Sequence, residues 1–399
     1  MMAEHTVDSA IPLPPDAAGG PLPASADDTS DIAAVTQGRF AHGDEGYLSL
    51  VWRRFRRSVV GMIGLVLVAA LLIMAVFADF FAPMDPKDQT ISFAPPDSIA
   101  FENADGSFSL LPKIYPIVET DQLDPITFQP ITGPDLEHPV NLGFFVTGYS
   151  YNVLWFIPAN IHFFGSTDPA QAVHFLGTDK LGRDILSRGI IGSRITLTIA
   201  LIVVLLTTTV GTLVGITSGY LGGRFDTWVQ RFVEIVLAFP QLPLYLALTT
   251  LIPVTAPSNI FIAFVIGVMA TLGWAQLSRE VRSKTLSLSR IEYVRAAVAV
   301  GSPDFRIITR HILPNVLSHI IVAVTLAIPS VILLESFLGF LGFAVKPPLI
   351  SWGLMLQDTG TFSVIGSYPW ILSPVVFVLI AVFAFNALGD GLRDAVDPY

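Results

Sequence analysis

Long apolar runs without charge restrict what this chain can fold into more than any other feature. A helix needs about 20 apolar residues to cross the hydrocarbon core of a bilayer. Five segments reach that length with at most one charged residue in each: Val59–Ala78, Ile195–Leu221, Ile235–Ser278, Ile320–Leu341 and Trp370–Leu388. The third is too long for one span, and Pro253 and Pro257 divide it into two helices. The sequence therefore predicts an all-α polytopic membrane protein with six transmembrane helices.

Composition fits a membrane protein and excludes several kinds of site. Of the 399 residues, 52% are hydrophobic and only 14% are charged, and the mean hydropathy is +0.64. The chain has no cysteine, which excludes disulfides, thiolate metal sites, iron–sulfur clusters and a cysteine nucleophile. A net charge of -10 does not indicate nucleic-acid binding. No HExxH or GxSxG motif occurs, so we expect neither a metal site nor a catalytic residue.

Basic residues predict the direction of the spans. The run WRRFRR (52–57) directly precedes the first span, so the N-terminus should face the cytoplasm. Six spans then return the C-terminus to the same side. In this orientation 15 of the 22 Lys and Arg residues lie on cytoplasmic segments, and the opposite orientation would reverse that ratio.

The spans divide the rest of the chain into regions. Residues 1–45 hold eight acids and only Arg39, which predicts a disordered cytoplasmic tail. Residues 46–82 form an amphipathic lead-in and the first span, 83–175 a far-side insert, and 176–399 a core domain with the other five spans. The insert carries eleven acids against Lys87 and Lys113, and its short aromatic runs predict a small folded domain with strands. We expect it either to meet a partner protein or only to cap the far-side mouth of the core.

A basic loop, residues 279–317, joins the fourth and fifth spans on the cytoplasmic side. Burying its seven Lys and Arg residues in lipid would cost roughly 20 kcal/mol, so the loop must lie in water. Ala296, Ala297 and Val300 form an apolar strip, Gly301 and Pro303 predict a turn, and a second helix runs into Leu-Pro-Asn at 313–315. A solvated connection would not need this pattern, which favours a short exposed helix offered to a partner protein.

This loop resembles the cytoplasmic "EAA" loop of ABC importer permeases. The family motif is E-A-A, three residues, G, nine residues and I-x-L-P, and five positions match it: Ala296, Ala297, Gly301, Leu313 and Pro314. Arg295 replaces the family glutamate and His311 the isoleucine, so no particular salt bridge carries over from the first position. The resemblance implies a coupling helix that rests in a groove of a separate ATPase. The residues it implies in that contact are Glu292, Arg295, Ala296, Ala297, Gly301, Ser302, Pro303, Leu313 and Pro314.

Five further segments resemble blocks of the same family, in the family's order. They are FLGTDKLGRDILSRGIIGSRITL (175–197), SGYLGGRFD (218–226), LAFPQLPLYLAL (237–248), LLESFLGFLGFAVKPPLISWGLML (333–356) and NALGDGLRDAVDP (386–398). Together they cover most of 53–398 and point to the second permease subunit of oligopeptide, dipeptide and nickel importers, the OppC/DppC type. The resemblance implies the type I ABC importer permease fold, with a periplasmic insert between the first two helices, in the bacterial inner membrane.

The partners follow from the same resemblance. The chain has no GxxxxGK[ST] loop to hold ATP phosphates, so it binds no cofactor itself, and ATP and Mg would be used by one or two partner ATPase subunits. The other implied partners are a homologous sister permease of the OppB/DppB type, a periplasmic substrate-binding protein and membrane lipids. Oligopeptides are the expected substrates, while nickel chelates, opines and oligosaccharides stay open. An intramembrane enzyme or a membrane scaffold is the remaining alternative.

Several residues within the spans are candidates for the translocation path. Pro240 and Pro243 predict a kink in the third span, and kinked helices often line cavities. Glu335 is the only charge within the six segments, and it could line the path or form a hydrogen bond to a neighbouring helix.

Glycines of the second span also predict a contact. Small residues recur every four positions on one face of this span: Gly211, Gly215 and Gly219. Such spacing lets two helices approach closely in lipid. The contact lies either near the translocation path or within the chain. At the start of the same span, Asp179, Arg183 and Asp184 are expected to cap and fix the helix.

Overall fold

The computed structural model describes residues 47–102, 108–123, 130–154, 156–253, 255–343 and 345–396. The chain divides into two units, residues 1–50 and 51–399. Only residues 47–50 of the first unit are described, and they form the start of α2 (Tyr47–Phe55). The predicted disordered tail, residues 1–45, lies outside the described residues.

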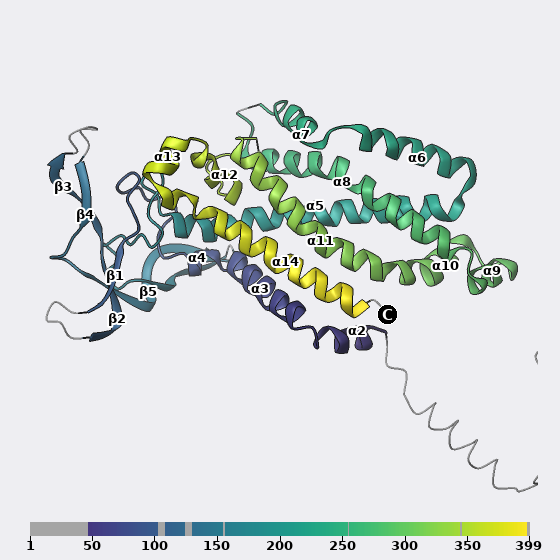
Figure 1. Cartoon of the computed structure of the whole chain (residues 1–399), viewed down its shortest axis with the longest axis horizontal. Helices are drawn as coiled ribbons and strands as arrows, with labels where there is room; N and C mark the ends of the chain where they lie inside the picture. Colours follow the sequence, from purple (N-terminus) through teal and green to yellow (C-terminus); the bar gives the residue numbers. More distant parts are fainter. Residues whose placement is uncertain are drawn as a thin grey trace, which may run out of the picture. The chain divides into compact units, whose positions relative to one another are not determined.

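The helices of the second unit confirm a polytopic helical membrane protein (Figure 1). Among the described residues, five are long and apolar enough to cross a membrane: α3 (Val59–Val76), α5 (Ile185–Leu221), α8 (Ser258–Leu288), the helix Asp304–Phe340 and the helix Pro369–Val396. A sixth span exists if the pair α6 (Gly223–Ala238) and α7 (Gln241–Thr249), which is bent by 78°, is counted as one. The predicted six spans correspond to that count.

The second span begins ten residues before the predicted start. Asp184 is the N-cap of α5, and its Oδ2 accepts a hydrogen bond from the backbone N–H of Ser187 at 2.7 Å. Capping satisfies an N–H group that would otherwise have no partner at the helix start. The predicted capping role of Asp184 is therefore confirmed, and α5 extends beyond the apolar run at this end.

The third span differs from the prediction in its start. It begins at Gly223, not Ile235, and breaks where α6 ends at Ala238 and Pro240 becomes the N-cap of α7. The predicted kink in this span is confirmed, and it lies at Pro240, where α6 and α7 meet at 78°. Pro243 lies in the first turn of α7, where a missing N–H costs little, and adds no second break. Pro257 is the N-cap of α8, which confirms the predicted division of the long apolar run.

Short helices connect the last two spans. They are α12 (Trp352–Leu356), η2 (Gln357–Thr359), α13 (Phe362–Ser367) and η3 (Pro369–Leu372), and they lead into α14 (Pro374–Val396). α14 continues eight residues beyond the predicted end at Leu388. Its apolar face packs with α3, α5 and α11 (Leu313–Phe340) in one core cluster that includes Val68, Leu197, Ile332 and Ala384.

The insert between the first two spans contains the predicted strands, so the chain is not purely α-helical. The strands are β1 (Ser98–Glu102), β2 (Phe108–Tyr115), β3 (Ile117–Leu123), β4 (Pro130–Pro134), β5 (Val140–Val153) and β6 (Ile157–Ser166). They form an antiparallel sheet in the order β1-β2-β5-β6 and a separate β3–β4 pair. Ile114, Val140, Leu142 and Val173 form a small core beneath the sheet. α4 (Ala78–Phe81) joins the first span to this region.

The glycines of the second span face α8. A Cβ atom added to Gly211, Gly215 or Gly219 would lie 2.8, 2.6 or 2.9 Å from a backbone oxygen of α8. These oxygens belong to Trp274, Ser278 and Arg282. The small-residue spacing therefore brings two backbones of the same chain together, as expected for helix packing in lipid.

Gly215→Ala should lower the stability of the bundle by about 1–3 kcal/mol, because the methyl group would meet the Ser278 carbonyl oxygen and only a shift of a whole helix can relieve it. Gly267→Ala is the matched control, since it adds the same methyl group to α8 in open space. Thermal unfolding of the detergent-solubilised chain measures the difference. Equal melting temperatures for the two variants would show that the α5–α8 contact tolerates a wider spacing.

Candidate functional site

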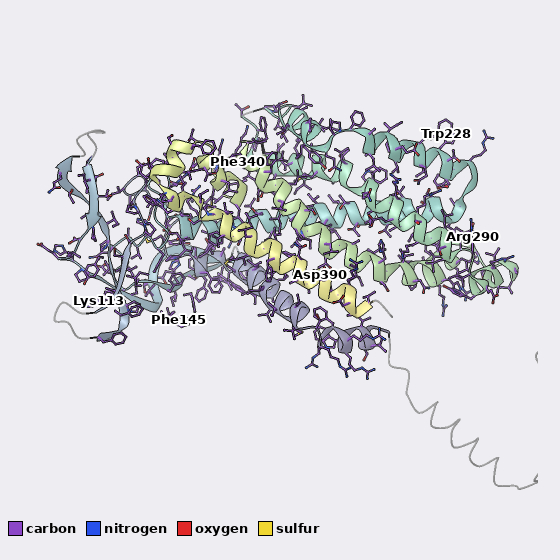
Figure 2. All side chains as sticks on the ribbon, in the orientation of Figure 1. Lys113, Phe145, Trp228, Arg290, Phe340 and Asp390 are labelled. Atoms are coloured by element: carbon purple, nitrogen blue, oxygen red, sulfur yellow. The ribbon has the colours of Figure 1, made fainter. Side chains whose placement is uncertain are left out.

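The predicted short helix and turn are present at the end of the bundle opposite the strands. α9 (Glu292–Ala299) begins two residues after Arg290, which Figure 2 places at that end, whereas Lys113 on β2 lies at the other. The N–H groups of Gly301 and Ser302 donate to the carbonyls of Val298 and Ala297 at 3.0 and 3.1 Å. This pair of bonds is a Schellman motif, which requires a left-handed residue, and Gly301 has a φ of +77°. The glycine turn is therefore confirmed.

The helix after the turn is continuous with the fifth span. α10 (Asp304–Ile307) passes through a π-helical turn, η1 (Ile308–Ile312), into α11. The Leu313 N–H donates to the Ile308 carbonyl, five residues back, directly before Pro314, which has no N–H to donate. The Leu-Pro-Asn segment is thus the first turn of α11 rather than the end of a separate helix, and α10, η1 and α11 form one continuous element.

The inner face of α9 is fixed to three spans. Val294 is buried in a cluster with residues of α5, α8 and α10–α11: Ile216, Val281, Ile307, Ile312, Val316 and Ile320. The Tyr220 hydroxyl at the end of α5 donates to Asp304 Oδ1 at 2.8 Å. Asn315 Nδ2 donates to the Tyr293 hydroxyl at 3.2 Å and to the His311 carbonyl at 2.7 Å. α9 and its turn are therefore held by packing and by hydrogen bonds at both ends.

The outer face of the same segment is apolar and exposed. Val300 and Phe305 are 80% and 78% exposed, and Val298 is 54% exposed. Ala296 is exposed but Ala297 is half-buried and packs toward the bundle, so the predicted strip of Ala296, Ala297 and Val300 is not one face. The outward apolar surface consists instead of Val298, Val300 and Phe305.

The other residues predicted to contact an ATPase also include both exposed and inward-facing side chains. Glu292, Arg295, Pro303 and Pro314 are exposed, Ser302 is half-buried, and Leu313 packs against the inner cluster. Sequence reasoning missed Tyr220 and Asp304, which join the turn to α5. The quoted block SGYLGGRFD contains Tyr220, but its partner lies 84 positions away, so no local pattern connects the two.

A second connection at this end was also missed. Asp226 at the start of α6 accepts two hydrogen bonds from Arg282 of α8, both at 2.5 Å, and one from the Ser218 hydroxyl at 2.5 Å. A two-bond Arg–carboxylate pair fixes orientation as well as distance. It holds the beginning of the bent third span against α8.

Of the residues proposed for the path, Gly211, Gly215 and Glu335 are buried, whereas Pro240 and Pro243 are exposed. Glu335 is fully buried, and its Oε2 accepts a hydrogen bond from the Thr196 hydroxyl of α5 at 3.2 Å. The Thr196 hydroxyl oxygen in turn accepts a hydrogen bond from the backbone N–H of Trp352 in α12 at 3.1 Å. Gly211 and Gly215 face α8 within the same chain. For Glu335, Gly211 and Gly215 the geometry therefore favours a contact between helices of this chain over a position on the translocation path. Pro240 lies at the break between α6 and α7.

A polar group fixes the start of α5, next to the insert. Asp179 accepts from Arg183 Nε at 2.8 Å and forms an ion pair with its Nη2 at 2.7 Å. His174 Nδ1 lies 3.2 Å from Asp184 Oδ1. Asp97 accepts backbone N–H bonds from His174 and Ile117, and burial, which outweighs these bonds, raises the pKa of its carboxyl.

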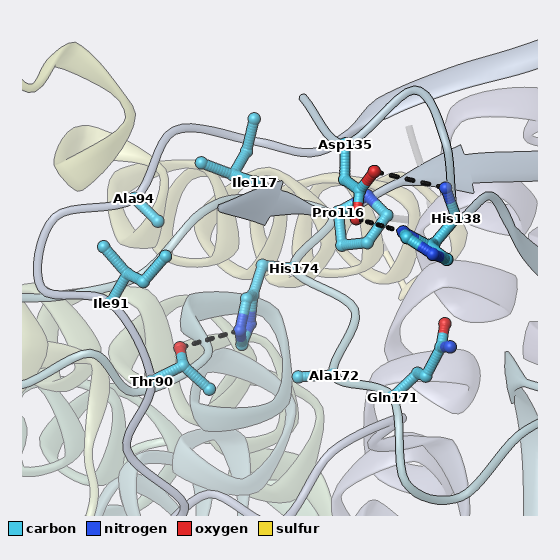
Figure 3. Close-up of a pocket in the computed structure, with 10 residues that line it drawn as sticks. All are labelled: Thr90, Ile91, Ala94, Pro116, Ile117, Asp135, His138, Gln171, Ala172 and His174. Carbon is cyan, nitrogen blue, oxygen red and sulfur yellow. Dashed lines mark hydrogen bonds and ion pairs between the residues drawn. The ribbon is translucent and has the colours of Figure 1, made fainter. Parts of the chain in front are cut away.

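A cavity of about 370 Å³ opens beside this group in the insert (Figure 3). His138 and His174 both line it; His138 Nδ1 lies 3.0 Å from Asp135 Oδ2, and His174 Nε2 lies 2.9 Å from the Thr90 hydroxyl. Within the described ranges, no three His, Asp or Glu side chains are grouped so that they could hold a metal ion.

Comparison with known proteins identifies the family. Residues 211–399 match the family described as "Binding-protein-dependent transport system inner membrane component", and residues 46–96 match "N-terminal TM domain of oligopeptide transport permease C". The oligopeptide transport system permease protein OppC of Haemophilus influenzae is 40% identical over 250 residues, which cover 61% of this chain and 78% of that protein. The chain belongs to this family of inner membrane transport components.

Two further relatives have similar coverage. OppC of Escherichia coli K12 is 42% identical over 58% of this chain and 75% of its own length. The dipeptide transport system permease protein DppC of Bacillus subtilis is 37% identical over 58% of this chain and 70% of its own. The chain is therefore a multi-pass permease subunit of an OppC/DppC-type ABC importer, and the family match includes the whole segment from α9 to α11.

Glu335→Gln should leave the permease close to wild type in both stability and transport, because the amide keeps an oxygen for the Thr196 hydroxyl. Glu335→Ala should cost about 2–4 kcal/mol, since it leaves a cavity and removes the partner of that hydroxyl. Thermal unfolding and uptake assays of both variants separate the two roles. Loss of uptake in Glu335→Gln without loss of stability would assign the carboxylate to the path.

Proposed function

We propose that this chain is one of two homologous permeases of a peptide importer, and that α9 with its turn is the surface on which an ATPase subunit docks. The observation that carries the proposal is the two-sided geometry of this segment. Its inner face is bound to α5, α8 and α11, and its outer face presents Val298, Val300 and Phe305. A short helix of this kind can receive a push from a partner protein and pass it to three spans at once.

The energy source lies outside this chain. It has no GxxxxGK[ST] loop, so ATP and Mg would act on one or two partner ATPase subunits. When those subunits close, α9 moves with them, and the bonds of Tyr220–Asp304 and Asn315–Tyr293 require α5 and α11 to follow. The bundle then rocks between two packed arrangements, as in other rigid-body switches.

Peptides are the substrate class we infer. Relatives with 37–42% identity are named as oligopeptide and dipeptide permeases, and residues 46–96 match the N-terminal domain of oligopeptide transport permease C. A binding protein would deliver the peptide on the far side, where the insert has eleven acids against two lysines. That charge fits a partner surface with basic residues. The distribution of Lys and Arg supports a cytoplasmic position for α9 and for both termini.

Gly301→Val should uncouple ATP hydrolysis from uptake. A β-branched residue in a left-handed conformation costs about 1–3 kcal/mol, so the turn would adopt another geometry. Gly301→Asn is the control at the same position, because Asn tolerates this conformation and nothing lies within 4 Å of the new Cβ. Measured in proteoliposomes with the partner subunits, uptake per ATP should fall about 5-fold or more for Val and stay near wild type for Asn.

Normal uptake by Gly301→Val would remove the turn from the coupling mechanism. Failure of both variants to assemble with the ATPase would instead place Gly301 in the folding of the loop. Binding of a peptide by the associated binding protein is scored separately, so the substrate inference can fail while the docking inference stands.

Single cysteines should reveal the two sides of the membrane, because the chain has none of its own. Val300→Cys on the outer face of the α9 turn should react with a membrane-impermeant maleimide only after the cells are permeabilised. Leu136→Cys in the insert, which is 70% exposed, should react in intact cells. Labelling of Val300→Cys from outside would overturn the proposed orientation and the docking of an ATPase at α9.

A further inference from the structure

The β5–β6 hairpin carries more exposed apolar surface than a strand pair in water tolerates. Phe144, Phe145 and Phe156 are 67%, 66% and 73% exposed, and Ile157 and Ile161 on β6 are also exposed. β6 is an edge strand of its sheet. A long apolar edge in water is an aggregation hazard, and a large exposed apolar patch marks a contact with a protein or a membrane.

The turn of this hairpin lies beside the membrane-spanning part of the first two spans. Asn152 and Leu154 line a cavity of about 410 Å³ together with residues of α3 and α5: Leu72, Ala75, Val76, Leu197, Thr198 and Leu201. Leu72 is one turn inside the end of α3, and Leu201 is two turns, roughly 10 Å, beyond Arg194 on α5. The turn of the hairpin therefore lies alongside the apolar parts of α3 and α5 and not beyond their ends, at a level that the hydrocarbon core of the bilayer can reach.

An ion pair marks the level where the hydrocarbon ends. Arg194, nine residues after the start of α5, and Asp79 of α4 form this pair, with Arg194 Nη2 and Asp79 Oδ2 2.9 Å apart. Arg194 Nε also donates to the Ala75 carbonyl at 3.1 Å. Both residues line the same cavity as Leu154. Since charged side chains lie at the membrane boundary rather than in its centre, Leu154 lies at or below the interface.

The base of the hairpin is fixed at the same level. The two ring nitrogens of the buried His162 lie 2.9 Å from the Asp79 carbonyl oxygen and 3.0 Å from the Tyr149 carbonyl oxygen. Tyr151 donates to the Ile161 carbonyl at 2.6 Å within the hairpin. The hairpin is therefore attached to the end of the first span and has a defined depth.

Phe144 and Phe145 gather on one side although they are consecutive. A regular strand would direct them to opposite faces. Phe145 instead has a φ of +56°, and both rings lie within 6 Å of the Phe163 ring, at 5.6 and 5.9 Å between centroids. Phe80 of α4 is 5.9 Å from the same ring. Figure 2 shows Phe145 on β5, next to the α4 end of the first span. Aromatic groups at this level are typical of membrane interfaces.

We propose that the β5–β6 hairpin lies in the far-side interfacial layer of the bilayer, with Phe144, Phe145 and Phe156 in contact with lipid. Ile73 and Val76 on α3 are exposed apolar side chains too, and Val76 lines the same cavity as Leu154. Backbone groups along the open edge of β6 prevent deeper insertion, because hydrocarbon cannot satisfy them. This depth is that of an interfacial anchor, several ångströms into the boundary between headgroups and acyl chains.

Two phenylalanines form a matched pair for a test of depth. Phe156 and Phe108 are 73% and 75% exposed, but Phe108 is the first residue of β2, a strand that Figure 1 shows away from the spanning helices. Phe156→Cys and Phe108→Cys each give a single site for a nitroxide label. The full chain, with the subunits that co-purify with it, is placed in phospholipid nanodiscs. Relaxation by oxygen, which concentrates in lipid, is compared with relaxation by a water-soluble nickel chelate.

The label at position 156 should show an oxygen-to-nickel accessibility ratio several-fold above that at position 108. An equal ratio at both positions would place the hairpin in water and overturn the proposal. Exclusion of both reagents from position 156 would also overturn it, because a protein subunit would then cover the hairpin. If Phe156→Cys does not fold, Ile157→Cys on β6 replaces it with the same expected ratio.

Discussion

Close contact between α5 and α8 is the interaction on which the rest of the structure depends. In lipid, helices gain nothing from burying apolar surface against each other, so contact requires close backbone approach. Gly211, Gly215 and Gly219 allow it along the last third of the 37-residue helix α5. The same helix is capped by Asp184 at its start, next to the insert, and supports α9 at its other end through Ile216. One long helix, α5, therefore positions three regions. They are the insert, the buried contact of Glu335 and the turn at Gly301.

Parts of the structure that depend on local chemistry or on a long periodic signal were predictable from the sequence. The apolar runs indicated the spans, because only a helix satisfies its own backbone in lipid. Gly301 predicted a turn because glycine adopts a left-handed conformation without strain, and Pro303, two residues later, is the N-cap of the next helix. Asp184 predicted the cap of α5, since a carboxylate directly before an apolar helix can accept from its first N–H groups.

Parts that depend on distant residues were not predictable in the same way. The hydroxyl of Tyr220 meets Asp304 across 84 positions, and Thr196 meets Glu335 across 139, so neither pair leaves a local pattern. Hydropathy placed the start of the second span at Ile195, because Arg188 and Arg194 interrupt the apolar run. Both side chains have partners near the far-side end, which lets α5 begin at Ile185. Nothing in the local sequence distinguishes Pro240 from Pro243. Pro240 lies at the break before α7, whereas Pro243 lies within the first turn of α7, where a proline is tolerated.

Depth in the membrane decides which partner each exposed apolar surface can have. Val300 and Phe305 are about as exposed as Phe156, yet the segment around them includes Arg295, Arg306 and other charged residues that cannot enter hydrocarbon. A protein is the partner that can cover those side chains while leaving the charges in water. Phe156 follows a turn that shares a cavity with the apolar residues of α3 and α5, so lipid already lies at its level. The same kind of surface therefore suits the coupling we propose at one end of α5 and the anchoring we propose at the other.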